Sequence, residues 1–179
     1  MTSLEKQIIH WKLDSGHSQL TFKVKHLMIS HVTGEFQRFD GHLISSNEDF
    51  DKAKIEETVD SKSIYTNNLE RDKHLRSMDF FDTDLYKDLK FRGTAFEKLD
   101  EKNYKLMGLL TIKGITKEVK LEADYGGVMT DPQGQEKAGF SVTGKINRKD
   151  WGLKWNVNLG NGGVLVGGEV RINGEFQFI

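Results

Sequence analysis

The sequence of 179 residues contains no cysteine and only one proline. Without cysteine the chain has no disulfide bonds and no thiolate metal ligands, although this leaves the cellular compartment open because a large core needs no crosslinks. No stretch approaches the roughly 18 to 20 apolar residues of a membrane-spanning helix. The net charge is -1, with acids and bases mixed along the chain, so the basic face of a nucleic-acid-binding protein is lacking. The composition therefore excludes a disulfide scaffold and membrane insertion, and argues against a nucleic-acid partner.

The amino-terminal segment also lacks the apolar run of a secretory signal peptide. We therefore expect a cytoplasmic protein, whereas a chain trimmed at its amino terminus would be periplasmic or secreted. The length suits one domain over residues 1–179, and we expect residues 1–10 to form a poorly ordered amino-terminal segment.

Apolar and polar residues alternate along most of the chain, and this period of two is typical of half-buried β-strands. In segment 18–26, for example, Leu20, Phe22 and Val24 share one face, while Lys23 and Lys25 lie on the other. Short polar turns separate the segments, which predicts an antiparallel meander. About eight strands are predicted, at residues 18–26, 32–46, 55–61, 89–96, 104–112, 118–125, 138–146 and 164–178.

A sheet of this size must cover its apolar face, and with little helix available it does so most simply by closing into a barrel. An eight-stranded barrel either fills its interior with side chains or holds a small ligand. Glycines that face the interior help to decide between these two possibilities, because they contribute no side chain and so leave room along the barrel axis. Alternatively, they permit tight bends of the strands at barrel corners. The glycines with inward parity are Gly93, Gly108, Gly144, Gly168 and Gly174.

Strands of about ten residues give a barrel roughly 25 Å tall, and a lumen of that length lined by Phe, Val, Ile and Leu suits an elongated hydrocarbon chain. Burial of such a chain gains roughly 0.8 kcal/mol per methylene. The residues predicted to contact the apolar tail are Phe22, Val24, Phe36, Phe80, Phe81, Phe91, Phe140 and Ile146.

A short helical insert is predicted around residues 67–86. Asn67 followed by Glu70 is a helix-start signature, Asp72 and Arg76 have the spacing of a helical ion pair, and Asp82 is expected to cap a further turn. The insert joins a cationic cluster to an aromatic pair, which suits an amphipathic ligand; the alternative is a solvated helix whose Phe residues fill the core. The predicted head-group residues are Arg71, His74 and Arg76, with His17 as a further candidate.

Metal and catalytic sites find little support. The pairs His26 with His31 and His17 with His74 lack convincing helical spacing, and a zinc site needs three or four convergent ligands. Ser77 near His74 has no visible oxyanion hole or orienting acid. We therefore expect no metal, no catalytic residue and no enzymatic activity.

Several segments in order along the chain resemble the YceI-like family: 14–18 (DSGHS), 22–30 (FKVKHLMIS), 71–82 (RDKHLRSMDFFD), 108–117 (GLLTIKGITK) and 146–152 (INRKDWG). The resemblance covers nearly the whole chain from about Trp11. This sequence differs from the family pattern at Ser15 and at Lys87, two positions where the family often has proline. The difference at Lys87 affects the expected path of the loop after Tyr86.

The resemblance implies a lipocalin-like extended barrel that holds an amphipathic long-chain lipid, such as a polyisoprenoid with a pyrophosphate or quinone head. It also implies a binding protein and a homodimer. Our hypothesis is binding, sequestration or transport of an isoprenoid or fatty ligand, with no cofactor other than this lipid. One alternative is a hydrolase or isomerase that acts on a small hydrophobic substrate. Another is a structural or stress-related interaction module whose barrel interior is filled with side chains. Residues 156–163 are either a flap over the barrel mouth or a long hairpin connection.

Overall fold

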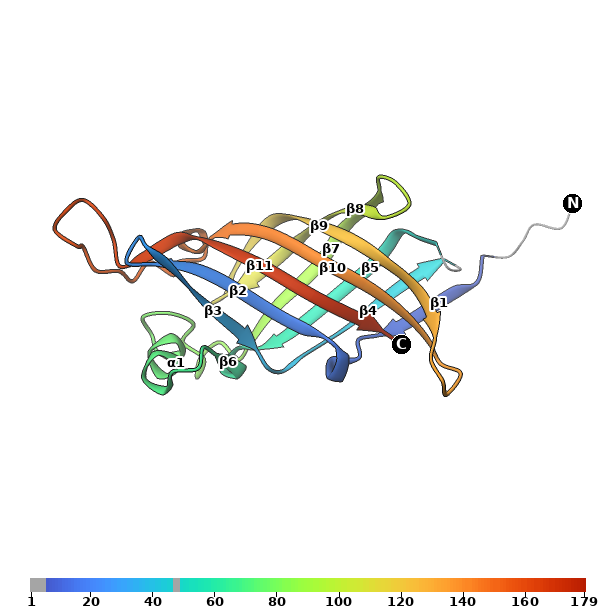
Figure 1. Cartoon of the computed structure of the whole chain (residues 1–179), viewed down its shortest axis with the longest axis horizontal. Helices are drawn as coiled ribbons and strands as arrows, with labels where there is room; N and C mark the ends of the chain where they lie inside the picture. The colour runs from blue at the N-terminus through green and yellow to red at the C-terminus, as the bar shows by residue number, and fades with distance from the viewer. Residues whose placement is uncertain (1–5, 47–48) are drawn as a thin grey trace, which may run out of the picture.

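The computed structural model describes residues 6–46 and 49–179 of the chain. Within these residues, one antiparallel sheet contains all eleven strands and curls around an apolar interior (Figure 1). The strands are β1 (Ile8–Lys12), β2 (Gln19–His26), β3 (Ser30–Phe36), β4 (Phe39–Ser46), β5 (Asp49–Asp60), β6 (Ile64–Tyr65), β7 (Asp88–Lys98), β8 (Asn103–Ile112), β9 (Ile115–Thr130), β10 (Glu136–Asn147) and β11 (Val166–Phe178). The helices are α1 (Leu69–Arg76) and the short 3-10 helices η1 (Ser15–His17), η2 (Ser61–Ser63) and η3 (Arg148–Trp151).

The sheet closes on itself at one end. The strand order is β1-β4-β5-β7-β8-β9-β10-β11-β2-β3-β6, and every pairing is antiparallel. Beyond β1 the chain crosses to β11, where Leu13 forms a bridge with Phe178 and the Lys12 N–H donates to the Ile179 carbonyl at 2.7 Å. The predicted all-β, lipocalin-like class is confirmed.

The predicted number of eight strands is wrong, because the described chain has eleven. Segment 32–46 does not form one strand, because it is interrupted at Gln37 and Arg38 between β3 and β4. The backbone groups of these two residues form hydrogen bonds with η2 and with the residue before it. The Gln37 N–H donates to the Ser63 carbonyl at 3.1 Å, and the Arg38 carbonyl accepts from Asp60 at 2.9 Å. The short β6 and the amino-terminal β1 supply the other two strands.

The predicted poorly ordered segment 1–10 is only partly open to test. Residues 1–5 lie outside the described residues. Ile8 begins β1, which pairs with β4 from Ile8 opposite Ser46 to Lys12 opposite His42. The prediction is therefore wrong for residues 8–10, which form an ordered sheet edge.

The helical insert is present, but its start differs from the prediction. The N-cap is Asn68, whose Oδ1 accepts a hydrogen bond from the Arg71 N–H at 2.9 Å, while Asn67 has a left-handed φ of 58°. After α1 the chain forms turns, and the Asp82 carbonyl accepts from Leu85 and Tyr86 at 3.1 and 2.9 Å. None of the helices among the described residues is long and apolar enough to cross a membrane.

The predicted ion pair between Asp72 and Arg76 is not among the contacts of the described residues. Asp72 is buried and accepts from Thr66, and Arg76 donates to the Lys62 and Ile64 carbonyls at 2.9 and 3.0 Å. Both side chains therefore fix the insert to neighbouring backbone.

Aromatic rings fill the end of the sheet remote from α1. Phe50 is 1% exposed, and its ring centroid lies 5.6 Å from Trp11 and 5.2 Å from Phe140. Phe96 stacks on Tyr104 at 4.6 Å. Such contacts add roughly 0.5–1.5 kcal/mol each beyond area burial. This part of the interior is a packed core.

Three glycines on the inner wall accommodate phenylalanine rings. A Cβ at Gly108 would meet the Phe91 ring at 2.3 Å, and one at Gly174 would meet the Phe176 ring at 2.4 Å. A Cβ at Gly34 would likewise meet Phe22 at 2.3 Å. The rings lie against the wall where a side chain is lacking, which leaves more of the lumen open than a protruding ring would.

Candidate functional site

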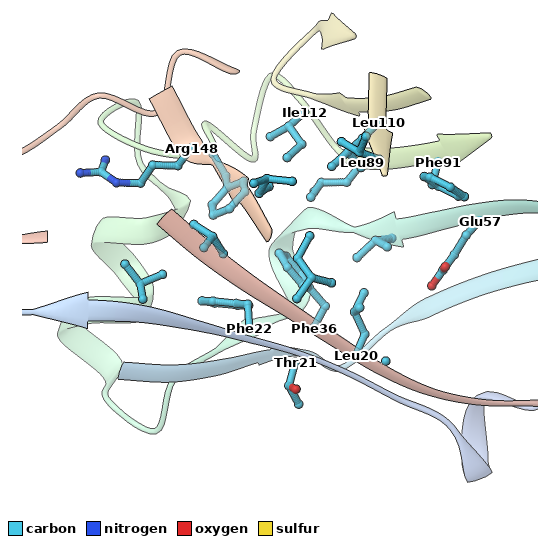
Figure 2. Close-up of a pocket in the computed structure, with 18 of the residues that line it drawn as sticks. Leu20, Thr21, Phe22, Phe36, Glu57, Leu89, Phe91, Leu110, Ile112 and Arg148 are labelled. Carbon is cyan, nitrogen blue, oxygen red and sulfur yellow. The ribbon is translucent and has the colours of Figure 1, made fainter. Parts of the chain in front are cut away.

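An apolar cavity of about 520 Å³ lies inside the sheet, between the aromatic core and α1 (Figure 2). Its volume falls within the range of about 300–1,000 Å³ that is typical of small-molecule sites. Nine of the eleven described strands, all except β1 and β6, contribute to its wall, and Leu75 of α1 and Phe80 line it at the end of the insert. The interior is thus hollow at this end and solid at the other.

All eight residues predicted to contact an apolar tail line this cavity. Phe36 is central among them, because its ring centroid lies 5.7 Å from that of Phe22 and 5.9 Å from that of Phe81. The predicted tail contacts left out further residues of the cavity wall, such as Leu20, which the sequence pattern already placed on the same face as Phe22 and Val24, and Ile172. Their alternation with polar neighbours was the available signal.

The predicted head-group residues Arg71 and His74 also line the cavity, on α1, together with the acid Glu70. Arg71 donates through Nε to Thr66 Oγ1 at 2.7 Å and through Nη2 to the Thr66 carbonyl at 2.6 Å. These two bonds fix the guanidinium beside the cavity and do not use Nη1.

The imidazole of His74 is held on three sides. Its Nε2 lies 2.8 Å from Asp79 Oδ2, and its ring meets Phe80 and Trp155 edge-on at centroid distances of 5.0 and 4.5 Å. The Ser77 hydroxyl donates to the backbone carbonyl of His74 at 2.6 Å and not to the ring. The geometry therefore does not pair this serine with the imidazole as a nucleophile with its base.

The other two head-group candidates do not line the cavity. Arg76 is bound to the two backbone carbonyls described above. His17 is exposed, with Nδ1 2.8 Å from Asp14 Oδ2, and this hydrogen bond is the main cause that lowers the pKa of Asp14. The structure thus brings together Arg71 and His74 but neither Arg76 nor His17.

A buried carboxylate supports the position of Arg71. Asp72 Oδ1 accepts from both the backbone N–H and the hydroxyl of Thr66, whose carbonyl and hydroxyl in turn accept from Arg71. Asp72 is 2% exposed and Thr66 is 4% exposed. The start of α1 is therefore tied to the segment before it.

Substitution Asp72→Ala is expected to lower the free energy of unfolding by about 2 kcal/mol, because it leaves the buried N–H of Thr66 without an acceptor. Asp72→Asn retains an acceptor oxygen and should cost about half as much. Urea denaturation followed by tryptophan fluorescence measures both effects. Equal losses in the two variants would contradict this role of the oxygen.

Arg148 of η3 borders the cavity and is itself buried (Figure 2). It donates through Nε to the Gly167 carbonyl at 2.8 Å, through Nη1 to Leu153 at 2.5 Å and through Nη2 to Val166 at 3.2 Å. Burial lowers the pKa of the guanidinium. All three of these partners are backbone carbonyls.

The segment before β11 is a hairpin connection. The Leu159 N–H donates to the Gly163 carbonyl at 3.0 Å, and the Leu165 N–H donates to the Val157 carbonyl at 2.9 Å. Leu165, at the end of this connection, lines the cavity.

Glu57 of β5 is a cavity-lining residue that the sequence interpretation missed. Its side chain points into the pocket (Figure 2), and burial raises its pKa to about 7. The sequence pattern contained this information, because Ile55, Glu57 and Val59 occupy every second position of the strand and therefore share its inner face.

Among residues 6–46 and 49–179, no group of three or more His, Asp or Glu side chains is arranged to hold a metal ion. The cavity offers a long apolar wall, a cationic and aromatic end at α1, and one enclosed carboxyl group. This arrangement suits binding of an apolar molecule with a polar group.

Comparison with known proteins gives a consistent result. The family model described as a YceI-like domain matches residues 11–178. A UPF0312 protein of Staphylococcus aureus strain N315 is 39% identical over 170 residues, which cover 94% of this chain and 96% of that protein.

Two solved structures share the fold. BcnA of Burkholderia cenocepacia superposes with a TM-score of 0.80 at 18% identity, over 92% of this chain and 98% of BcnA. A protein described as a polyisoprenoid binding domain from Saccharophagus degradans superposes with a TM-score of 0.66 at 14% identity, over 94% of this chain and 97% of that one.

Proposed function

Because this chain belongs to the YceI-like domain family, we propose that it binds the apolar tail of a long-chain amphipathic lipid in the cavity inside its sheet. The observation that carries the proposal is the apolar cavity of about 520 Å³, whose wall includes every residue predicted to contact such a tail. The description of the Saccharophagus structure as a polyisoprenoid binding domain supports an isoprenoid ligand.

The tail supplies most of the binding free energy in this proposal. Each methylene moved from water into the cavity gains roughly 0.8 kcal/mol, so a chain of a dozen carbons needs few polar contacts. Ordering the ligand and the wall offsets part of this gain. A preformed cavity keeps that cost low, because the Phe rings of its wall are already packed against one another.

The head group is proposed to lie at the α1 end, beside Arg71 and His74. Thr66 fixes the guanidinium through two hydrogen bonds, and Asp79 and Trp155 hold the imidazole. Among residues 6–46 and 49–179, Nη1 of this fixed guanidinium has no hydrogen-bond partner, so it is a suitable donor to a phosphate or quinone oxygen.

A carrier explains the cavity better than an enzyme does, because the wall is apolar and the serine beside His74 bonds to backbone. Transport or sequestration by a homodimer stays a prediction from the family resemblance, and the cytoplasmic location stays a prediction from the amino-terminal sequence.

A matched pair of substitutions on β2 tests the proposal. Val24 lines the cavity and its neighbour Lys23 is exposed on the outer face. We expect Val24→Trp to weaken binding of geranylgeranyl pyrophosphate at least tenfold, about the loss of two buried methylenes, because the indole occupies the space of the tail. Lys23→Trp should change the affinity less than twofold. Intrinsic fluorescence titration measures both, and circular dichroism checks that the fold is retained.

Equal affinities of the two variants would show that the tail does not enter the cavity. A wild-type protein that binds no prenyl ligand, and that yields no lipid in native mass spectrometry after purification, would refute the proposal altogether.

A further inference from the structure

Glu57 occupies an unusual place for a carboxylic acid, because it lies on the inner face of β5 between two apolar residues. Its neighbours on that face of the strand are Ile55 and Val59, and across the sheet it is opposite Gly41 of β4 and Phe91 of β7. Its side chain is half-buried and borders the cavity. The carboxyl group is therefore aimed into the lumen (Figure 2).

No polar side chain from the adjoining strands satisfies this carboxyl group. Its Oε1 is buried and has no hydrogen-bond partner among the described residues. The inner faces of β4 and β7 present Leu43, Leu89 and Phe91. The charged neighbours Glu56 and Arg92 are exposed on the outside, whereas Lys90 is exposed and also borders the cavity. Burial is the one cause of its raised pKa, with no contribution from a nearby charge.

The other titratable side chains that border the cavity come from several elements, and Figure 2 shows Arg148 on the opposite side of the pocket from Glu57. They are His26, Glu70, Arg71, His74, Lys90 and Arg148. Three of these belong to α1, at the end of the cavity where the head group is proposed to lie.

A buried polar group without a partner costs free energy, and a stable fold has no use for it in an apolar wall. Leu or Val at this position would complete the wall at no such cost. A buried polar group without a partner is retained where a ligand supplies the missing hydrogen bond, because binding sites commonly lower stability in favour of function.

We propose that Glu57 is a ligand-binding residue whose carboxyl group forms a hydrogen bond with an uncharged hydroxyl group on the bound apolar molecule. This inference rests on the proposed function and specifies its ligand class. A hydroxyl fits both protonation states, because it accepts from the carboxylic acid and donates to the carboxylate. A phosphate or carboxylate is repelled by ionised Glu57, so an anionic group is directed to the α1 end.

The test compares two probes that differ only in a hydroxyl group: the branched C20 alcohol phytanol and its parent hydrocarbon phytane. Competition with a fluorescent lipid gives the affinity of each probe for the wild type and for three variants. We expect the wild type to prefer phytanol about tenfold, the effect of one well-placed hydrogen bond. Glu57→Leu should lose this preference and bind phytane at least as tightly as the wild type does.

Two further variants separate hydrogen bonding from packing. Glu57→Gln can still donate and accept, so its preference should stay within about threefold of that of the wild type. Glu56→Leu changes the adjacent exposed acid of the same strand and should leave the preference unchanged.

An equal preference for phytanol in the wild type and in Glu57→Leu would overturn the inference, because the hydroxyl would then bind elsewhere or Glu57 would hold only water. Binding of both probes without any preference would overturn it as well, while leaving the lipid-binding proposal intact. If neither probe nor the prenyl pyrophosphate bound to the wild type, the proposed function itself would fail.

Discussion

Substitution Arg148→Met is expected to lower the free energy of unfolding by about 4 kcal/mol. The buried guanidinium donates to the carbonyls of Leu153, Val166 and Gly167, and methionine leaves all three without this donor. Hydrogen bonds from a charged group are worth about 1.5–3 kcal/mol each, and the removed cost of burying the charge offsets part of the sum. Methionine retains most of the apolar stem, so the loss reports on hydrogen bonding more than on packing.

Equilibrium urea unfolding measures this effect, and the adjacent Lys149 offers a control. Lys149 is exposed, so Lys149→Met should change the stability by less than about 0.5 kcal/mol. Arg148→Lys should recover only a part of the loss, because an ammonium cannot reach three carbonyls in the planar geometry of the guanidinium. A loss below about 1 kcal/mol in Arg148→Met would contradict the structural role of this residue.

The alternation of apolar and polar residues was sufficient to predict the fold class and much of the cavity wall. It placed Phe22 and Val24 on the inner face of β2, where the structure has them. It did not predict the break between β3 and β4, because that break depends on backbone bonds from Gln37 and Arg38 to η2, which is more than twenty residues away in sequence. Local patterns contain no information on such pairings.

Polar side chains were harder to assign, since their partners are mostly backbone groups. Arg71 and Arg76 look equivalent in sequence, yet Arg71 borders the cavity and Arg76 binds the carbonyls of Lys62 and Ile64. The same difficulty applies to Arg148, whose partners are the backbone carbonyls of Leu153, Val166 and Gly167. Charge alone identifies neither the direction of a side chain nor a carbonyl acceptor.

Glu57 was missed for another reason. The predicted polar contacts rested on positive charge near the helical insert, whereas the period-two pattern of Ile55 and Val59 already places Glu57 inside the sheet. An acid at an inward position of a strand is therefore worth examining in any sequence of this class, because it must be paired, protonated or reserved for a ligand.

Substitution Glu57→Gln is expected to remove a pH dependence of stability that amounts to about 3 kcal/mol. Burial raises the pKa of Glu57 from 4.5 to about 7, so the folded protein holds this proton more tightly than the unfolded chain does. The stabilisation is fully present below about pH 4.5 and is lost as the pH rises through 7. A shift of one pKa unit corresponds to about 1.4 kcal/mol, which sets the expected size.

The quantity to measure is the difference in the free energy of unfolding between wild type and Glu57→Gln at a series of pH values from 4.5 to 8. This difference cancels the titration of other acids, such as Asp14, whose pKa is lowered and which titrates at lower pH. The wild type should lose stability relative to Glu57→Gln as the pH rises, and Glu57→Leu should exceed the wild type most at pH 8. Glu122→Gln, at an exposed position of β9, should show no such slope. A constant difference across the series would mean that Glu57 is solvated or paired in the folded protein, because its pKa would then not be raised by burial.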